Sequence, residues 1–148
     1  MHTIFGPNVM FTPDTEQVKS MYEQDNSLAL LGITITKVEP NHTEGEMTIT
    51  KEMCNGFDTI QGGILFTFAD ALFAGACNTT TATPTVASQV NIHFIAPGKI
   101  GTTLRGVARQ TQTWGRNGLT DVTIYDGERA IAEFRGMSRT TSHPPTEK

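Results

Sequence analysis

The sequence is poor in several features that mark specialised classes of protein. It has only two cysteines, too few for a disulfide framework, so we expect reduced thiols in a cytoplasmic protein. The longest apolar stretch, from about Ile64 to Cys77, is interrupted by Thr67 and Asp70 and is too short and too polar to span a bilayer. The N-terminus has no basic segment leading into an apolar run, so we expect no secretory signal and no membrane association.

Motifs for common cofactors are also lacking. None of the four histidines has metal-site spacing with an acid or a cysteine pair, so we expect no metal. There is no phosphate-binding loop, no dinucleotide fingerprint and no G-x-S-x-G motif. Between Lys99 and Lys148 eight basic residues face five acids, an excess too small for a nucleic-acid-binding surface. That excess is compatible with a small anionic ligand.

What the chain does have is the composition of a globular domain. Hydrophobic residues make up 37% of the 148 residues and charged residues 18%, which suits one domain with one sizeable core. We expect that domain to cover residues 1–141 and to be followed by a disordered tail over residues 142–148.

The apolar pattern predicts two helices and six strands. Thr12, Pro13 and Asp14 begin a helix that Gly32 ends. A second helix, from Gly62 to about Asn78, is apolar on every side, which is typical of a buried helix. Strand-like runs are Ile33–Glu39, Glu44–Thr50, Thr85–Ala96, Thr102–Gln112, Leu119–Tyr125 and Arg129–Arg139. The order predicts an α+β fold in which an antiparallel sheet of five to six strands wraps around one long central helix, with an additional N-terminal helix.

Asp70 is the first candidate for chemistry. It is the only charged residue between Thr59 and Gly98 and lies in the middle of the apolar helix. Buried, unpaired acids tend to have raised pKa values, which suits acid–base catalysis. A plain polar contact at a subunit interface or in a water pocket is an equally good interpretation at this point.

The glycine pair at the start of this helix is the second candidate. Free N–H groups and the positive end of the helix dipole at Gly62 and Gly63 can stabilise a developing oxyanion, although a flexible junction also explains the pair. Gly62 and Asp70 are eight residues apart, roughly 12 Å along one helix, so they cannot both touch one carbonyl group. If both are catalytic, the acid must come from a second copy of the helix, which predicts an obligate dimer with two equivalent sites.

One polar residue interrupts an apolar strand face. Alternation along Thr85–Ala96 places Ser88 on the apolar face toward the central helix and His93 on the opposite, polar face. A serine that bonds to backbone is the commoner role, and we expect His93 to be structural or exposed.

The run from Asn55 to Asp70 resembles the signature of hotdog-fold thioesterases of the phenylacetic-acid-degradation type. That signature is Asn, then His-Gly-Gly six residues later, then an acid eight residues after the first Gly. The similarity extends to about Arg139 and includes Ile92–Gly98 and the later Gly115-Arg116 pair. It implies a hotdog fold, homodimers that often pair into tetramers as dimers of dimers, and an acyl-coenzyme A substrate. Coenzyme A would be part of the substrate, with no separate cofactor.

The resemblance also implies roles for individual residues. Asp70 would be the nucleophile or the general base, and the Gly62 N–H would polarise the thioester carbonyl. Asn55 would hold the water or the carbonyl, and Ser88 would assist hydrolysis. Gln61 stands where the family has His; glutamine can still hydrogen-bond, and the oxyanion donor would be backbone.

Further residues are candidates for substrate contacts. Gly63 is a candidate for substrate binding and Phe57 for the acyl pocket, and Lys99, Arg109 and Arg116 are candidates for the coenzyme A phosphates. The predicted reaction is hydrolysis of a short- or medium-chain acyl-CoA or an aryl-acetyl-CoA such as phenylacetyl-CoA. One alternative is an acyl-CoA-binding or regulatory protein without catalysis. A hotdog dehydratase ranks last, because it would need a catalytic histidine near the central helix.

Overall fold

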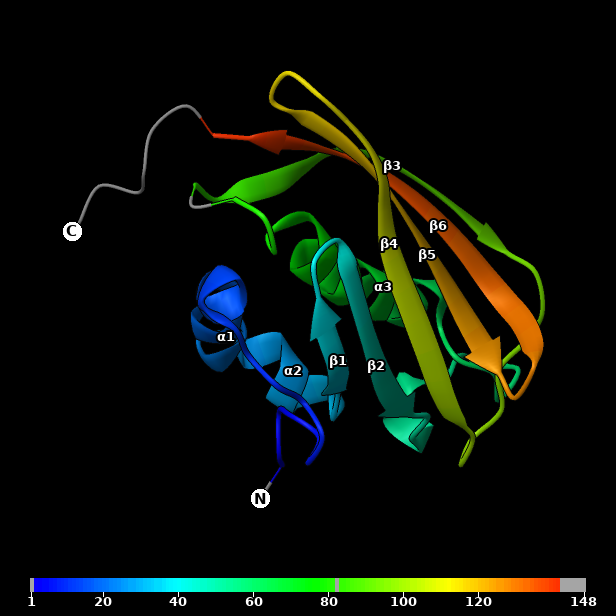
Figure 1. Cartoon of the computed structure of the whole chain (residues 1–148). Coiled ribbons are helices and arrows are strands. Elements are labelled where there is room, and N and C mark those ends of the chain that lie inside the picture. Colours follow the sequence, from blue (N-terminus) through cyan, green and yellow to red (C-terminus); the bar gives the residue numbers. More distant parts are fainter. Residues whose placement is uncertain (1, 82, 142–148) are drawn as a thin grey trace.

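A computed structural model describes residues 2–81 and 83–141 of the chain (Figure 1); the predicted tail, residues 142–148, lies outside the described residues. Its elements are, in order, η1 (Pro13–Thr15), α1 (Glu16–Glu23), α2 (Asn26–Leu31), β1 (Thr34–Glu39), β2 (His42–Thr48), η2 (Lys51–Met53), α3 (Gly62–Cys77), β3 (Thr85–Phe94), β4 (Thr103–Trp114), β5 (Asn117–Asp126) and β6 (Arg129–Thr140). In the described part of the chain, no helix is long and apolar enough to cross a membrane.

The six strands form one antiparallel sheet that curves around α3 (Figure 1). Their order is β1-β2-β4-β5-β6-β3, so β1 and β3 are the edge strands. The predicted sheet of five to six strands around a long central helix is therefore confirmed. The outer edge of β1 is partly covered by the N-terminal segment, where Phe5 forms a parallel bridge with Ile35.

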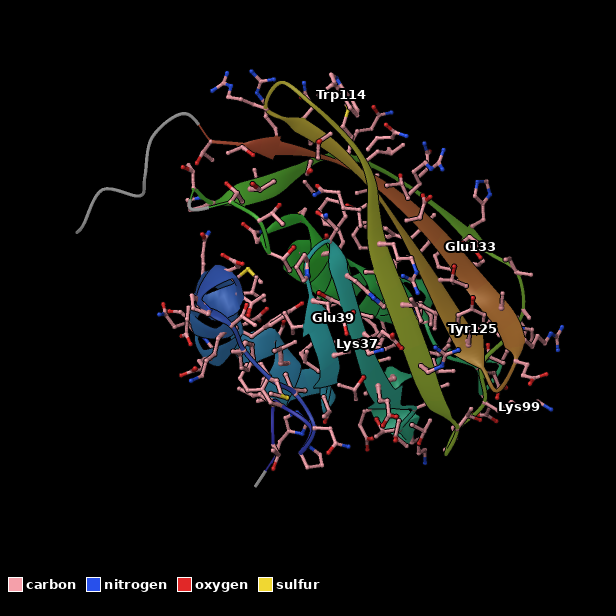
Figure 2. All side chains as sticks on the ribbon, viewed as in Figure 1. Lys37, Glu39, Lys99, Trp114, Tyr125 and Glu133 are labelled. Carbon is pink, nitrogen blue, oxygen red and sulfur yellow. The ribbon has the colours of Figure 1, made fainter. Side chains whose placement is uncertain are left out.

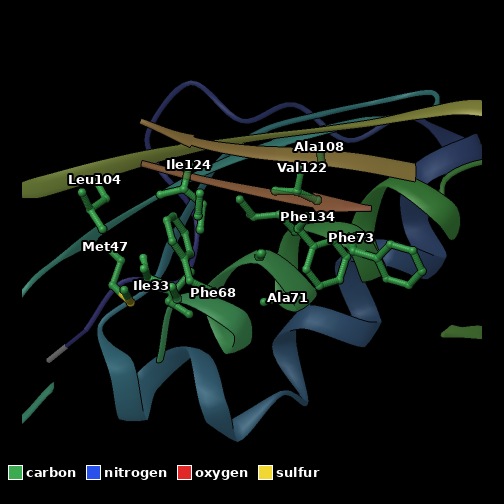
Figure 3. Close-up of a cluster of buried hydrophobic side chains, with 14 of the residues drawn as sticks. Ile33, Met47, Phe68, Ala71, Phe73, Leu104, Ala108, Val122, Ile124 and Phe134 are labelled. Carbon is green, nitrogen blue, oxygen red and sulfur yellow. The ribbon is translucent and has the colours of Figure 1, made fainter. Parts of the chain in front are cut away.

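The core lies between α3 and the concave face of the sheet. Strand β5 alternates buried with half-buried residues along most of its length, as expected for a sheet with one face packed and the other exposed. Its inward-facing side chains meet α3 in the cluster drawn in Figure 3, which includes Phe68, Phe73, Leu104, Ala108, Val122, Ile124 and Phe134. Burying such a large apolar side chain stabilises the fold by about 1.5–3 kcal/mol.

Close contact between helix and sheet depends on glycine at two strand positions. A Cβ atom at Gly136 would lie 2.5 Å from the Phe73 ring, and one at Gly106 would overlap Leu72. Both glycines face α3 and leave room for its large side chains. A larger residue at either position would push the central helix away from the sheet.

The N-terminal helix differs from the prediction of one helix ending at Gly32. The segment forms η1, α1 and α2, with a break at Asp25. The Asp25 carboxylate accepts a hydrogen bond from the Ser27 N–H at 2.9 Å and so caps a new helix, because an aspartate at this position satisfies a free amide of the first turn. Gly32, at φ 65°, ends α2 as expected.

The prediction that α3 is buried on every side is wrong for one stripe. The residues of that stripe are exposed or half-buried: Gly63, Phe66, Thr67, Asp70 and Ala74. These positions follow helical spacing, so they share one face. The rest of α3 is covered by the sheet and by α1, whose buried Tyr22 donates a hydrogen bond to the Ala71 carbonyl at 2.6 Å.

Candidate active site

The start of α3 presents two unpaired amide donors. The Gln61 carbonyl accepts hydrogen bonds from the N–H groups of Ile64 at 3.0 Å and Leu65 at 3.2 Å. The N–H groups of Gly62 and Gly63 have no hydrogen-bond partner among residues 2–81 and 83–141. They lie at the positive end of a helix of 16 residues, where free donors and the helix dipole favour a negatively charged oxygen. The sequence prediction of an oxyanion donor at Gly62 therefore has the required local geometry.

A pocket of about 340 Å³ lies in front of this helix start. Its lining residues are Asn55, Thr59, Ile60, Gly62, Leu65, Phe94, Ile95, Ala96, Pro97 and Gly98. Ile60 and Leu65 are core residues, only 5% and 3% exposed, and form an apolar wall. Asn55 and Gly62, two of the predicted site residues, lie in this one pocket.

Hydrogen bonds hold the side chain of Asn55 in place through its oxygen and leave its Nδ2 group available as a donor. Its Oδ1 atom accepts hydrogen bonds from the Phe57 N–H at 2.9 Å, the Thr59 N–H at 3.3 Å and the Thr59 hydroxyl at 3.2 Å. Its Nδ2 group has no partner in the described part of the chain. Because Oδ1 is already engaged, Asn55 can offer the pocket a hydrogen-bond donor but no acceptor.

Short bridges hold the loop that carries Asn55. Thr59 forms an antiparallel bridge with Lys99, and the Ile60 N–H donates to the Gly98 carbonyl at 2.9 Å. Lys99 is exposed and lies next to the pocket through this bridge. Phe57, expected beside the acyl group, is 88% exposed at the loop tip and does not line the pocket of a single chain.

Asp70 lies two turns further along α3 and does not line this pocket. It is half-buried on the exposed stripe of the helix. Burial raises the pKa of its carboxyl above the ordinary value of 3.8, and the negative charge of Asp25 raises that pKa further. Within one chain, the structure keeps the candidate acid and the candidate oxyanion donor apart, as the helix geometry predicts.

Ser88 is exposed and lies outside the hydrophobic core, at a point where β3 is irregular. The register of β3 against β6 shifts between Ala87 and Gln89, and such a bulge interrupts the alternation on which the prediction depended. Ser88 is exposed, and its hydroxyl donates to the Met137 carbonyl at 3.0 Å. The commoner role of a serine bonded to backbone is confirmed, and His93 is exposed as expected.

The three basic candidates for phosphate binding are not gathered in one chain. Arg109 lies on the outer face of the sheet, with its Nη1 atom 3.5 Å from Nδ1 of His42. Arg116 belongs to the hairpin between β4 and β5, next to Trp114, which lies at the opposite end of the sheet from Lys99 (Figure 2). Only Lys99 lies close to the pocket.

No role was predicted for Phe94, although it lines the pocket beside Gly62. Nothing in the sequence distinguishes Phe94 from the other inward-facing apolar residues of its strand. Phe94 shares this inward face with Val90 and Ile92, and its position at the end of the edge strand β3 places it at the pocket beside Gly62.

Comparisons with known proteins relate the chain to thioesterases. The model of the thioesterase superfamily matches residues 57–133. The chain is 36% identical to the Escherichia coli acyl-coenzyme A thioesterase PaaI over 83% of its own length and 88% of that protein. It is 26% identical to human acyl-coenzyme A thioesterase 13, covering 86% of this chain and 91% of the human one.

Solved structures show the same fold. The E. coli PaaI protein from the phenylacetic acid degradation operon superposes with a TM-score of 0.84 at 34% identity, over 88% of this chain and 96% of that one. A thioesterase family protein from Silicibacter pomeroyi reaches a TM-score of 0.79 at 19% identity, over 85% and 96% of the two chains.

Proposed function

The chain belongs to the thioesterase superfamily and has its hotdog fold, and from this premise we propose that it hydrolyses the thioester bond of an acyl-coenzyme A. The products are a free acid and coenzyme A. The acyl group is short or medium in length, or an aryl-acetyl group such as phenylacetyl. Hydrolysis of a thioester needs an activated water or a nucleophile and a stabilised oxyanion, and the chain offers residues for each.

The observation that carries this proposal is the pair of free donors in one pocket. The Gly62 N–H and the Asn55 Nδ2 group both lack a partner among the described residues, and both residues line the pocket at the start of α3. An acyl oxygen placed there would receive hydrogen bonds as it becomes negative in the tetrahedral intermediate. Losing one such donor typically lowers turnover about 10²–10³-fold.

In this mechanism Asp70 acts in the site of the neighbouring subunit. Two α3 helices that run antiparallel about a two-fold axis would bring Asp70 of the partner subunit toward Gly62. The exposed stripe of α3 and the free edge of β3 support such pairing, since Phe66 is 37% exposed and Val86 is 54% exposed. The carboxylate then either attacks the carbonyl or removes a proton from the attacking water, and its raised pKa suits the second role. Dimers of dimers remain the proposed higher assembly.

Coenzyme A would be held mainly by charge. Lys99 lies next to the pocket, where its ammonium can meet a phosphate. Arg116 lines a small pocket together with Cys77, the last residue of α3, and antiparallel pairing of two helices would bring it toward the start of the partner's helix. Arg109, on the outer face of the sheet, is the weakest of the three candidates.

The test is thiol release from acetyl-, hexanoyl-, phenylacetyl- and palmitoyl-coenzyme A. Wild type is compared with Asp70→Asn and with Asp126→Asn, a control at an exposed turn. We expect wild type and the control to release thiol and Asp70→Asn to lose about 10²–10⁴-fold in kcat/KM. Hydrolysis by Asp70→Asn at the wild-type rate would refute the mechanism.

Stability separates loss of chemistry from loss of fold. A raised pKa means that the folded state disfavours the ionised carboxyl, so stability falls as pH rises above 3.8, the ordinary pKa of this group. Asn removes that penalty. At neutral pH the Tm of Asp70→Asn should therefore be no lower than that of wild type.

The alternative is binding of acyl-coenzyme A without catalysis. Gln61, in the place of the family histidine, is exposed and makes no side-chain cap bond to α3. A rise in Tm with acyl-coenzyme A but no thiol release from any of the four substrates would favour this function.

A further inference from the structure

Phe94 is an aromatic side chain that the hydrophobic core leaves half uncovered. It is the last residue of β3, an edge strand, and 54% of its surface is exposed. The pocket residues Ile60 and Leu65 are instead fixed in the core. Phe94 is thus an apolar wall of the pocket that can move without opening the core.

The Phe94 ring lies against the first residue of α3. A Cβ atom built on Gly62 would be 2.9 Å from Cζ of the ring and 3.2 and 3.3 Å from its two Cε atoms. Favourable contacts between carbon atoms begin at about 3.5 Å, so glycine is the residue that leaves room for the ring here. The N–H of Gly62 is attached to the same Cα atom, and an acyl oxygen bound to it would therefore lie beside the ring.

We propose that Phe94 determines which acyl groups the site accepts. This inference rests on the proposed function, because it places the thioester carbonyl on Gly62. With the carbonyl there, the first carbons of the acyl group lie against the ring. A flat or compact group, aromatic ones above all, packs on Phe94, whereas a long flexible chain has to displace it.

The surroundings of the ring support a role in selection rather than in folding. The polar groups of the pocket come from Asn55, Thr59 and Gly62, and these small groups offer little area to the body of an acyl group. Ile60 and Leu65 supply a rigid apolar wall. Two half-exposed apolar side chains, Phe94 and Ile95, also line the pocket. The Phe94 ring is the one nearest to Gly62, so it provides the adjustable surface against which acyl groups of different shape are distinguished.

The experiment measures kcat/KM for acetyl-, hexanoyl-, phenylacetyl- and palmitoyl-coenzyme A with wild type, Phe94→Ala and Phe94→Leu. Tyr125→Ala is the matched control, because Tyr125 is an aromatic residue on the outer face of the sheet, stacked 4.7 Å from the Arg105 guanidinium. For Phe94→Ala we expect kcat/KM for phenylacetyl-coenzyme A to fall about tenfold relative to the acetyl substrate, as for a lost aromatic pair. The palmitoyl substrate should improve relative to acetyl. Phe94→Leu should change both ratios in the same direction but less, and it carries the test if the alanine variant fails to fold.

The outcomes separate the two proposals. If wild type hydrolyses acyl-coenzyme A but both Phe94 variants keep its substrate ratios, the inference on Phe94 is wrong and the proposed function stands. If Tyr125→Ala changes the ratios as much as Phe94→Ala does, the selection by Phe94 is also refuted. If wild type hydrolyses none of the four substrates, both proposals are wrong.

Discussion

Replacing Gly62 by alanine tests the contact on which the pocket depends. Alanine in place of glycine within a helix normally stabilises it by about 0.5–1 kcal/mol. Gly63 should gain up to this amount, because no heavy atom of the same chain lies within 4 Å of the Cβ position there. At Gly62 the new methyl group meets the Phe94 ring at 2.9 Å, and crowding of this kind costs about 1–3 kcal/mol. Since the ring is half-exposed and can turn away, we expect a crowding cost at the lower end of this range. Gly62→Ala should therefore be about 1 kcal/mol less stable than Gly63→Ala.

Urea denaturation followed by circular dichroism measures this difference. Every variant is unfolded at the same two protein concentrations, so that self-association contributes equally to the apparent stability of each. The same pair is then measured in a Phe94→Ala background, where the difference between the two glycine variants should disappear. Equal stability of Gly62→Ala and Gly63→Ala, or a difference that persists without the Phe94 ring, would refute the predicted contact.

Two further predictions concern α1 and α2. Asp25→Asn keeps an acceptor for the Ser27 N–H but removes the charge that raises the pKa of Asp70. The acid limb of the profile of kcat/KM against pH should therefore move to lower pH. An unchanged limb would show that the charge of Asp25 has no effect on the Asp70 carboxyl. Tyr22→Phe removes a buried hydrogen bond to the Ala71 carbonyl. We expect the free energy of unfolding to fall by about 1 kcal/mol and the Tm, measured by calorimetry, to fall by roughly 3 °C. An unchanged Tm would mean that water solvates the hydroxyl equally well in the unfolded chain.

The central architecture was predictable because its signals are strong and local. The apolar run from Gly62 to Cys77 and the alternating strands follow helix and strand periods, and the spacing of Gly62 and Asp70 limits what one chain can do. The resemblance supplied the names of the site residues. The structure added that Asn55 and Gly62 share a pocket.

Other features depend on contacts that cannot be predicted from the pattern of apolar and polar residues. The break at Asp25 arises from a single capping side chain that competes with helix continuation. The register shift of β3 against β6, between Ala87 and Gln89, interrupts the alternation at Ser88. The position of Phe94 depends on β3 being an edge strand, which follows from the whole topology and not from the strand's own sequence.

The two edges of the sheet differ, and this difference limits how copies of the chain can add to one another. The outer edge of β1 is occupied near Ile35 by the N-terminal segment, through the bridge to Phe5 and the hydrogen bond from the Gly6 N–H to the Ile35 carbonyl at 2.8 Å. The edge of β3 has no such cover among the described residues. Open strand edges on both sides would invite polymerisation into a fibre. In the proposed pairing through β3, the two outer edges of the joined sheet would both be β1 edges partly covered by the N-terminal segment, which disfavours further growth of the sheet.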